Sequence, residues 1–276
     1  MPLALVLSSF VSASRIGGAA QQYVLAAYGI DPVLVPTVMY GRSPARGSQG
    51  QVTSPDLFRR MLADVEADAI FGMVDLVITG HFSSPEQVEI AADVLGRVRA
   101  AAARQPIVVV DPIMGDLPNG LYVNPQAAAA VAARLVPLAD WITPNLWELS
   151  HLSGHVIADA AGAVEAARAL GKPALVTSVP AGPDEVALLY VTADEARLFA
   201  HPRLPVAPSG TGDLVAASFG ASLVEGLAPA VAAERAARAA FEAVQAAQAW
   251  NASELPVVAL GPRLKNPVAE VRVERL

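Results

Sequence analysis

Short runs of β-branched and other apolar residues alternate along this chain with longer alanine-rich and leucine-rich stretches of helical periodicity. Parallel strands need long crossover connections, usually helices, so this alternation predicts an α/β fold with a central, mainly parallel sheet flanked by helices on both faces. We expect strands at Ala4–Leu7, Val33–Val38, Leu76–Thr79, Ile107–Val110, Trp141–Ile142 and Ala174–Thr177, and a hairpin at the sheet edge from Val186–Val191 and Arg197–His201. We expect helices at Ala19–Tyr28, Pro55–Ala67, Pro85–Ala103, Pro125–Leu135, Ala160–Leu170, Asp213–Glu225 and Pro229–Trp250.

Composition narrows the class of protein. The chain has 276 residues with no internal repeat or linker, so we expect one domain over residues 1–276. It is 54% apolar, yet no apolar run reaches the ~18 residues that span a bilayer, which favours a soluble protein without a membrane partner. Pro2–Leu7 has no basic leader and is interpreted as a buried first strand, not a signal peptide. The absence of cysteine fits a cytoplasmic enzyme, and the net charge of −7 argues against a nucleic-acid partner.

The segment Ser209–Asp213, of sequence Ser-Gly-Thr-Gly-Asp, leads directly into an apolar helical pattern. Its glycines, Gly210 and Gly212, allow close approach of a ligand, and the unpaired amides at a helix N-terminus bind anions. A carboxylate at Asp213 suits a base that takes a proton from an alcohol while the amides hold a phosphoryl group. The alternative is that the glycines only make a tight turn and Asp213 caps the helix.

Acidic and amide side chains follow two further strands. Asp111 and Asp116 lie just past the expected strand Ile107–Val110, and paired acids there suit a hydrated magnesium ion or the phosphates that it bridges. These acids could instead only accept hydrogen bonds from turn amides. Asn145 and Glu148 lie three residues apart at a strand-to-helix junction, and Glu148 could equally be a capping residue at the third helical position.

The order of these motifs resembles the ribokinase superfamily and, within it, the pyridoxal kinase family, over nearly the whole chain. The matching segments are Asp111–Asp116, Gly120–Val123, Leu135–Asn145, Val176–Ser178 and Gly210–Asp213. The resemblance implies a ribokinase-like fold and transfer of the γ-phosphoryl group of ATP to the 5′-hydroxymethyl group of pyridoxal. It also implies a homodimer and leaves room for a monovalent cation.

In such an enzyme Asp213 would be the catalytic base, and the amides of Gly210, Thr211 and Gly212 would stabilise the transferring phosphoryl group. The resemblance places ATP against a set of residues on the nucleotide side, namely Asp111, Thr143, Asn145, Glu148, Thr177 and Ser178. Magnesium would be held through Asp111, Asp116 and Glu148.

The substrate side departs from the family pattern. Ser9 matches a serine that holds the pyridine ring, although it could be an ordinary turn serine, and Gly17, Tyr40 and Ser43 are assigned to the ring by position. His81 stands where the family has tyrosine and could stack on the ring or face solvent as a loop histidine. The flap Gly41–Arg46 replaces a Ser-Asn-His-Thr segment, and its Arg42 and Arg46 could bind a phosphorylated substrate or be solvated.

Two alternatives stay open. Hydroxymethylpyrimidine (phosphate) kinase shares the fold and the hydroxymethyl acceptor, but that family usually carries a cysteine in its glycine turn and this chain has none. A non-catalytic pyridoxal-binding protein would keep the fold without turnover, and the intact Gly210–Asp213 turn argues against it.

Overall fold

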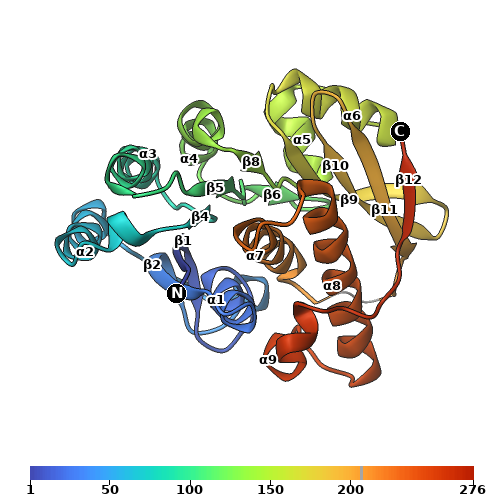
Figure 1. Cartoon of the computed structure of the whole chain (residues 1–276), viewed down its shortest axis with the longest axis horizontal. Coiled ribbons are helices and arrows are strands. Elements are labelled where there is room, and N and C mark those ends of the chain that lie inside the picture. Colours follow the sequence, from blue (N-terminus) through green and yellow to red (C-terminus); the bar gives the residue numbers. More distant parts are fainter. Residues whose placement is uncertain (206–207) are drawn as a thin grey trace.

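Uninterrupted runs of Val, Leu and Ile form the centre of the sheet, because both of its faces are covered by helices. The computed structural model describes residues 1–205 and 208–276, in which the strands form one ten-stranded sheet of order β12-β11-β10-β9-β8-β5-β4-β1-β2-β3 (Figure 1). Its strands are β1 (Leu3–Val11), β2 (Asp31–Tyr40), β3 (Gln51–Val52), β4 (Leu76–Thr79), β5 (Ile107–Val110), β8 (Trp141–Ile142), β9 (Ala174–Gly182), β10 (Glu185–Val191), β11 (Ala196–Pro202) and β12 (Arg272–Arg275). The short strands β6 (Gly115–Asp116) and β7 (Gly120–Leu121) form a separate two-stranded sheet.

The strands from β2 through β1, β4, β5 and β8 to β9 pair in parallel, which confirms the predicted mainly parallel sheet. The remaining pairs, including β9–β10–β11, are antiparallel. The expected hairpin exists as β10 and β11, but its predicted position at the edge is wrong. The C-terminal strand β12 pairs with β11 and forms the edge, and its short charged sequence gave no strand signal.

The helices begin close to the predicted residues. Ser54 and Ser84 cap α2 and α3 by accepting hydrogen bonds from Leu57 N (3.2 Å) and Gln87 N (3.3 Å). The helices are α1 (Gly18–Ala27), α2 (Pro55–Ala67), α3 (Pro85–Ala101), α4 (Pro125–Ala130), α5 (Leu146–Ser153), α6 (Ala160–Ala169), α7 (Thr211–Val224), α8 (Pro229–Ala249) and α9 (Val257–Leu260).

The expected single helix Pro125–Leu135 is wrong in one respect. The regular helix ends at Ala130 and continues as a π-helical turn over Val131–Leu135, just before Pro137. Pro137 then lies within a short 3₁₀ turn, Val136–Leu138, that leads to β8. None of the helices in residues 1–205 and 208–276 has both the length and the apolar composition needed to cross a bilayer.

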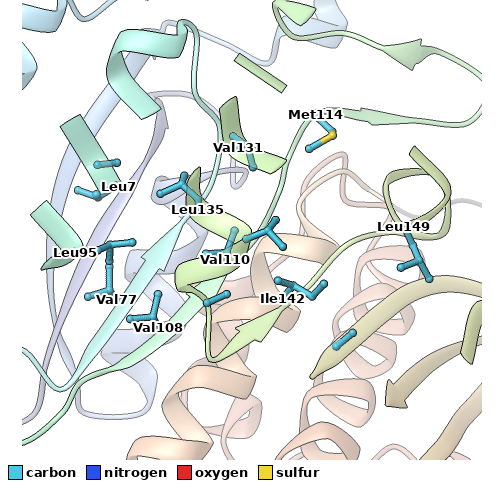
Figure 2. Close-up of a cluster of buried hydrophobic side chains, with 14 of the residues drawn as sticks. Leu7, Val77, Leu95, Val108, Val110, Met114, Val131, Leu135, Ile142 and Leu149 are labelled. Atoms are coloured by element: carbon cyan, nitrogen blue, oxygen red, sulfur yellow. The ribbon is translucent and has the colours of Figure 1, made fainter. Parts of the chain in front are cut away.

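Two apolar cores cover the two faces of the sheet. Alternate residues of one strand point to opposite faces, so Leu5 and Leu7 of β1 lie in the core beneath α2 to α6, whereas Ala4 and Val6 lie in the core beneath α1, α7, α8 and α9. Figure 2 shows part of the first core, including Leu7 of β1. Because the central strands are parallel, their carboxyl ends lie at one edge of the sheet, and the candidate residues follow those ends.

Candidate active site

The glycine turn begins α7 in a conformation that requires glycine. Gly210 is the N-cap residue of α7 and has a φ of 102°. A Cβ atom at this position would lie 2.3 Å from the carbonyl oxygen of Arg15. Larger residues are therefore excluded both by the backbone conformation and by the loop after β1, which packs directly on the turn.

Asp213 lies in the first turn of α7 and does more than cap that helix. Its Oδ2 accepts a hydrogen bond of 2.8 Å from the backbone amide of Gly17, a residue of another segment. The alternative in which Asp213 only caps its own helix is therefore wrong. Its Oδ1 is buried and has no hydrogen-bond partner among the described residues, which leaves this atom available to a ligand.

Burial gives Asp213 the character of a stronger base than an exposed aspartate. Desolvation raises its pKa from the ordinary 3.8 to about 6, while hydrogen bonds from the amides of Gly17 and of Asp213 itself limit the rise. Such a group is ionised at neutral pH and accepts a proton more readily than an exposed carboxylate.

Ser9 and Gly17 lie against each other beside Asp213. Gly17 is the N-cap of α1 with a φ of 60°, and a Cβ atom there would lie 2.2 Å from Ser9 Oγ. Ser9 belongs to β1 itself and is buried, so it is not an ordinary turn serine. The structure thus brings Gly17 next to the predicted base, and Ser9 lies against Gly17.

His81 follows β4 and is partly buried. Its Nδ1 is buried without a hydrogen-bond partner in the described part of the chain, and its carbonyl accepts a hydrogen bond of 2.6 Å from Thr37 Oγ1. Desolvation lowers the pKa of the imidazole to about 4, so the ring is neutral at physiological pH. A neutral ring with an unused nitrogen suits contact with an aromatic ligand.

The flap Gly41–Arg46 follows β2 and contains a short 3₁₀ turn at Pro44–Arg46. Tyr40 precedes it, with its ring against Gly50, and Ser43 is the buried N-cap of the turn. Arg46 keeps a side-chain exposure of 48%, and its Nη2 lies 2.9 Å from Oε1 of Glu254 in an ion pair that the sequence analysis did not predict.

Asp111 lies directly after β5 and is buried. Burial raises its pKa well above the ordinary value, and the negative charges of Glu148 and Asp213 raise it further. Asp116 is in β6, and its Oδ1 accepts a hydrogen bond of 2.7 Å from Asn119 Nδ2. Asp111 is thus within electrostatic reach of both other acids, whereas Asp116 is partly engaged by its own hairpin.

Asn145 and Glu148 form a capping box at the start of α5. Asn145 Oδ1 accepts from Glu148 N at 2.9 Å, and Glu148 Oε2 accepts from Asn145 N at 2.8 Å. The second oxygen of Glu148 accepts from Met114 N (2.9 Å) and Gly115 N (3.4 Å). Burial raises the pKa of Glu148 to about 7, although these amides stabilise its charged form.

The capping interpretation of Glu148 is therefore correct as geometry, and the residue also fixes the loop that connects Asp111 to Asp116. No group of three His, Cys, Asp or Glu side chains within the described residues is arranged to hold a metal ion on its own. The predicted magnesium ligands Asp111, Asp116 and Glu148 consequently do not form a complete cage.

A cavity of about 200 Å³ lies beside the glycine turn. Four predicted residues line it, two from β9 and two from the start of α7: Thr177, Ser178, Thr211 and Gly212. Ser178 has a φ of 64°, a strained conformation for a residue other than glycine. Thr143 follows β8, and its buried hydroxyl faces Asp111, where a hydrogen bond from Thr143 favours the charged form of that carboxyl and so lowers its pKa.

Sequence reasoning missed the other wall of this cavity. It is formed by β10, β11, the segment after β11 and α8, with lining residues that include Val186, Leu188, His201, Arg203, Ala237 and Val244. The alanine-rich helix α8 was expected only to pack. Its small side chains do pack, but they also leave the space that the cavity occupies, and only Arg203 offered a charge that could have signalled an anionic ligand.

Comparison with known proteins gives a consistent result. A family model described as phosphomethylpyrimidine kinase matches residues 18–258. The pyridoxine/pyridoxal/pyridoxamine kinase of Bordetella avium is 32% identical over 276 residues, which are 97% of this chain and 93% of that protein. The pyridoxal kinase of Leifsonia xyli is 33% identical over 228 residues, or 80% of each chain.

Among solved structures, the pyridoxal kinase of Leishmania donovani in complex with ADP and pyridoxamine is similar along the whole length of both chains. Its TM-score is 0.93 at 23% sequence identity, with 100% of each chain covered. At that identity the likeness establishes the fold, and it confirms the α/β architecture predicted from the sequence.

Proposed function

Because this chain belongs to the family of phosphomethylpyrimidine and pyridoxal kinases, which have the ribokinase-like fold, we propose that it transfers the γ-phosphoryl group of ATP to the 5′-hydroxymethyl group of pyridoxal. The product would be pyridoxal 5′-phosphate. The observation that carries the proposal is the pairing of Asp213 with Gly17. One carboxylate oxygen is held by the Gly17 amide, and the other is buried and unpartnered among the described residues.

The residues of this chain have distinct tasks in that reaction. Oδ1 of Asp213 takes the proton of the substrate hydroxyl, and a pKa of about 6 leaves the carboxylate ionised at neutral pH yet basic enough to accept it. The amides of Gly210, Thr211 and Gly212, at the positive end of the α7 dipole, stabilise the negative charge of the phosphoryl group during transfer. Thr177, Ser178 and Arg203 hold the nucleotide in the cavity beside the turn.

Magnesium fits the donor set around β5 and β6. All candidate ligands are carboxylates, and magnesium in nucleotide sites usually takes one or two carboxylates together with phosphate oxygens and water. Asp111 and Asp116 would hold the ion. Glu148 would fix the loop between them and add its negative charge beside Asp111. When bound, the ion would neutralise charge on the phosphates.

On the substrate side, Ser9 and His81 would hold the pyridine ring, with Gly17, Tyr40 and Ser43 around it. Support comes from the contact of Gly17 with Ser9 and from the buried, unpartnered Nδ1 of His81. A neutral imidazole can stack on a pyridine ring without having to shed a charge first.

The test is magnesium-dependent ATP consumption by the purified protein with pyridoxal, and in parallel with hydroxymethylpyrimidine. Asp213→Asn should lower turnover by about 10²–10⁴. Asp56→Asn, the same change in the first turn of α2 at an exposed site, should leave it intact. Preference for the pyrimidine would favour the activity named by the family model, and binding of pyridoxal without turnover would favour a non-catalytic binding protein.

Further properties belong to the same proposal. We propose that residues 1–276 act as one kinase domain, that the enzyme is a homodimer as the family resemblance implies, and that it works in the cytoplasm, where its phosphoryl donor ATP is available. Sedimentation of the purified protein tests the dimer. Addition of potassium or sodium to the kinetic assay tests for a monovalent cation.

A further inference from the structure

Glu254, in the loop between α8 and α9, holds together two segments from the other end of the chain. Its Oε2 accepts hydrogen bonds from Ser14 Oγ at 2.5 Å and from Arg15 N at 3.1 Å. Its Oε1 lies 2.9 Å from Nη2 of Arg46 in the flap. One carboxylate thus joins the loop after β1 to the flap after β2.

The loop that Glu254 holds is the one that contacts the proposed base and its turn. The carbonyl oxygen of Arg15 packs against Gly210, at the start of α7. Two residues further on, the amide of Gly17 donates to Asp213 Oδ2 at 2.8 Å. Glu254 therefore fixes the same short segment that sets the position of Asp213.

The flap is held at both ends of its turn. Ser43 is 6% exposed at the start of the turn, whereas Arg46, at its end, keeps a side-chain exposure of 48%. Besides the pair with Glu254, Arg46 Nη2 donates to the carbonyl oxygen of Ser253 at 3.4 Å. The flap also starts beside the loop after β1, since Ala13 N donates to the carbonyl oxygen of Gly41 at 3.0 Å.

We propose that Glu254 is a positioning residue that couples the flap Gly41–Arg46 to the geometry of Asp213. This inference rests on the proposed kinase function for its kinetic consequences, but not for its structural ones. The ion pair with Arg46 keeps the flap Gly41–Arg46 in place, and the hydrogen bonds to Ser14 and Arg15 keep the Gly17 amide on Asp213. Neither effect requires Glu254 to touch the substrate.

The two roles can be separated by the choice of variant. Glu254→Gln keeps an oxygen that can accept from Ser14 and Arg15, but it loses the ion pair. It should therefore behave like Arg46→Ala, with a KM for pyridoxal raised about threefold and kcat within about twofold, as expected for a partly exposed pair. Glu254→Ala also leaves the Ser14 hydroxyl and the Arg15 amide without their acceptor, and kcat should fall about tenfold or more. The KM for ATP should change little in all three variants.

The matched control is Arg134→Gln, which breaks an exposed ion pair with Glu89 that lies away from the site. Trypsin cleavage after Arg42 and Arg46, followed by mass spectrometry, reports flap opening without any turnover. It should be faster in Glu254→Ala and Glu254→Gln than in the wild type and the control. The melting temperature of each variant shows that it is folded.

The outcomes distinguish this inference from the proposed function. If the wild type and Arg134→Gln turn over pyridoxal equally and Glu254→Ala matches them, the role of Glu254 is refuted while the kinase function stands. If no protein turns over pyridoxal, the proposed function fails, and the rates of flap cleavage alone test the role of Glu254. Equal flap cleavage in the wild type and in Glu254→Ala would then overturn the inference.

Discussion

Replacing Asp213 by asparagine is expected to stabilise the protein while removing its activity. The asparagine carbonyl can still accept the Gly17 amide, so the contact that fixes the side chain survives. What disappears is a negative charge that is buried at an exposure of 7%. The increase in the free energy of unfolding therefore measures how strongly the buried charge of Asp213 destabilises the folded wild type.

The size of the effect follows from the pKa of Asp213. The pKa is raised from 3.8 to about 6 in the folded protein. Protonation of this group therefore favours the folded state fully below pH 3.8, and that contribution is lost as the pH rises through 6. The difference corresponds to about 3 kcal/mol. Above pH 7, Asp213→Asn should be more stable than the wild type by this amount, and at pH 5 by about half of it.

The assay is thermal unfolding of both proteins at pH 8 and pH 5, combined with the ATP turnover assay. For a chain of this size, about 3 kcal/mol corresponds to a rise in melting temperature of roughly 6 °C. Turnover should fall by about 10²–10⁴, the usual contribution of a general base. Equal melting temperatures at pH 8 would show that Asp213 is not a desolvated charge, and the argument for a strengthened base would then fail.

Three further outcomes are expected. The kcat/KM for pyridoxal should fall about tenfold per pH unit below pH 6, where Asp213 becomes protonated, and a profile flat down to pH 5 would contradict this. Gly17→Ala should lower the unfolding free energy by about 2–5 kcal/mol and reduce kcat, because the new Cβ would meet Ser9 Oγ and the backbone conformation is one that L-residues rarely adopt. Unfolding curves measure the first effect and steady-state kinetics the second. Arg203→Ala should raise the KM for ATP about tenfold without changing that for pyridoxal, which steady-state kinetics can separate.

The sequence predicted the fold well where strands are buried on both faces. The run Ile107–Val110 has no polar interruption, and β5 occupies those residues as predicted. Strand β12 escaped prediction because it is short, charged and at the edge, where only its hydrogen bonds to β11 define it. Tertiary pairing of that kind leaves no local pattern to detect.

The parts of the candidate site that are contiguous in the sequence could be predicted, and the contacts between distant segments could not. The turn Gly210–Asp213 is contiguous, so its residues and its place at the start of α7 could be predicted. The hydrogen bond from Gly17 to Asp213 and the ion pair of Arg46 with Glu254 join residues roughly two hundred positions apart. A single sequence read by itself carries no signal for such pairs, because neither partner stands out from the residues of its own segment.

The buried acids of the site do not stabilise one another as the partners of an ion pair do, because all of them carry charge of the same sign. Asp111 and Glu148 are buried, and both have raised pKa values, Asp111 partly because it faces the charges of Glu148 and Asp213. Like charges at close range oppose one another, so ionising all three is unfavourable until a cation is present. In the proposed reaction, this arrangement would therefore favour binding of a cation together with the phosphates.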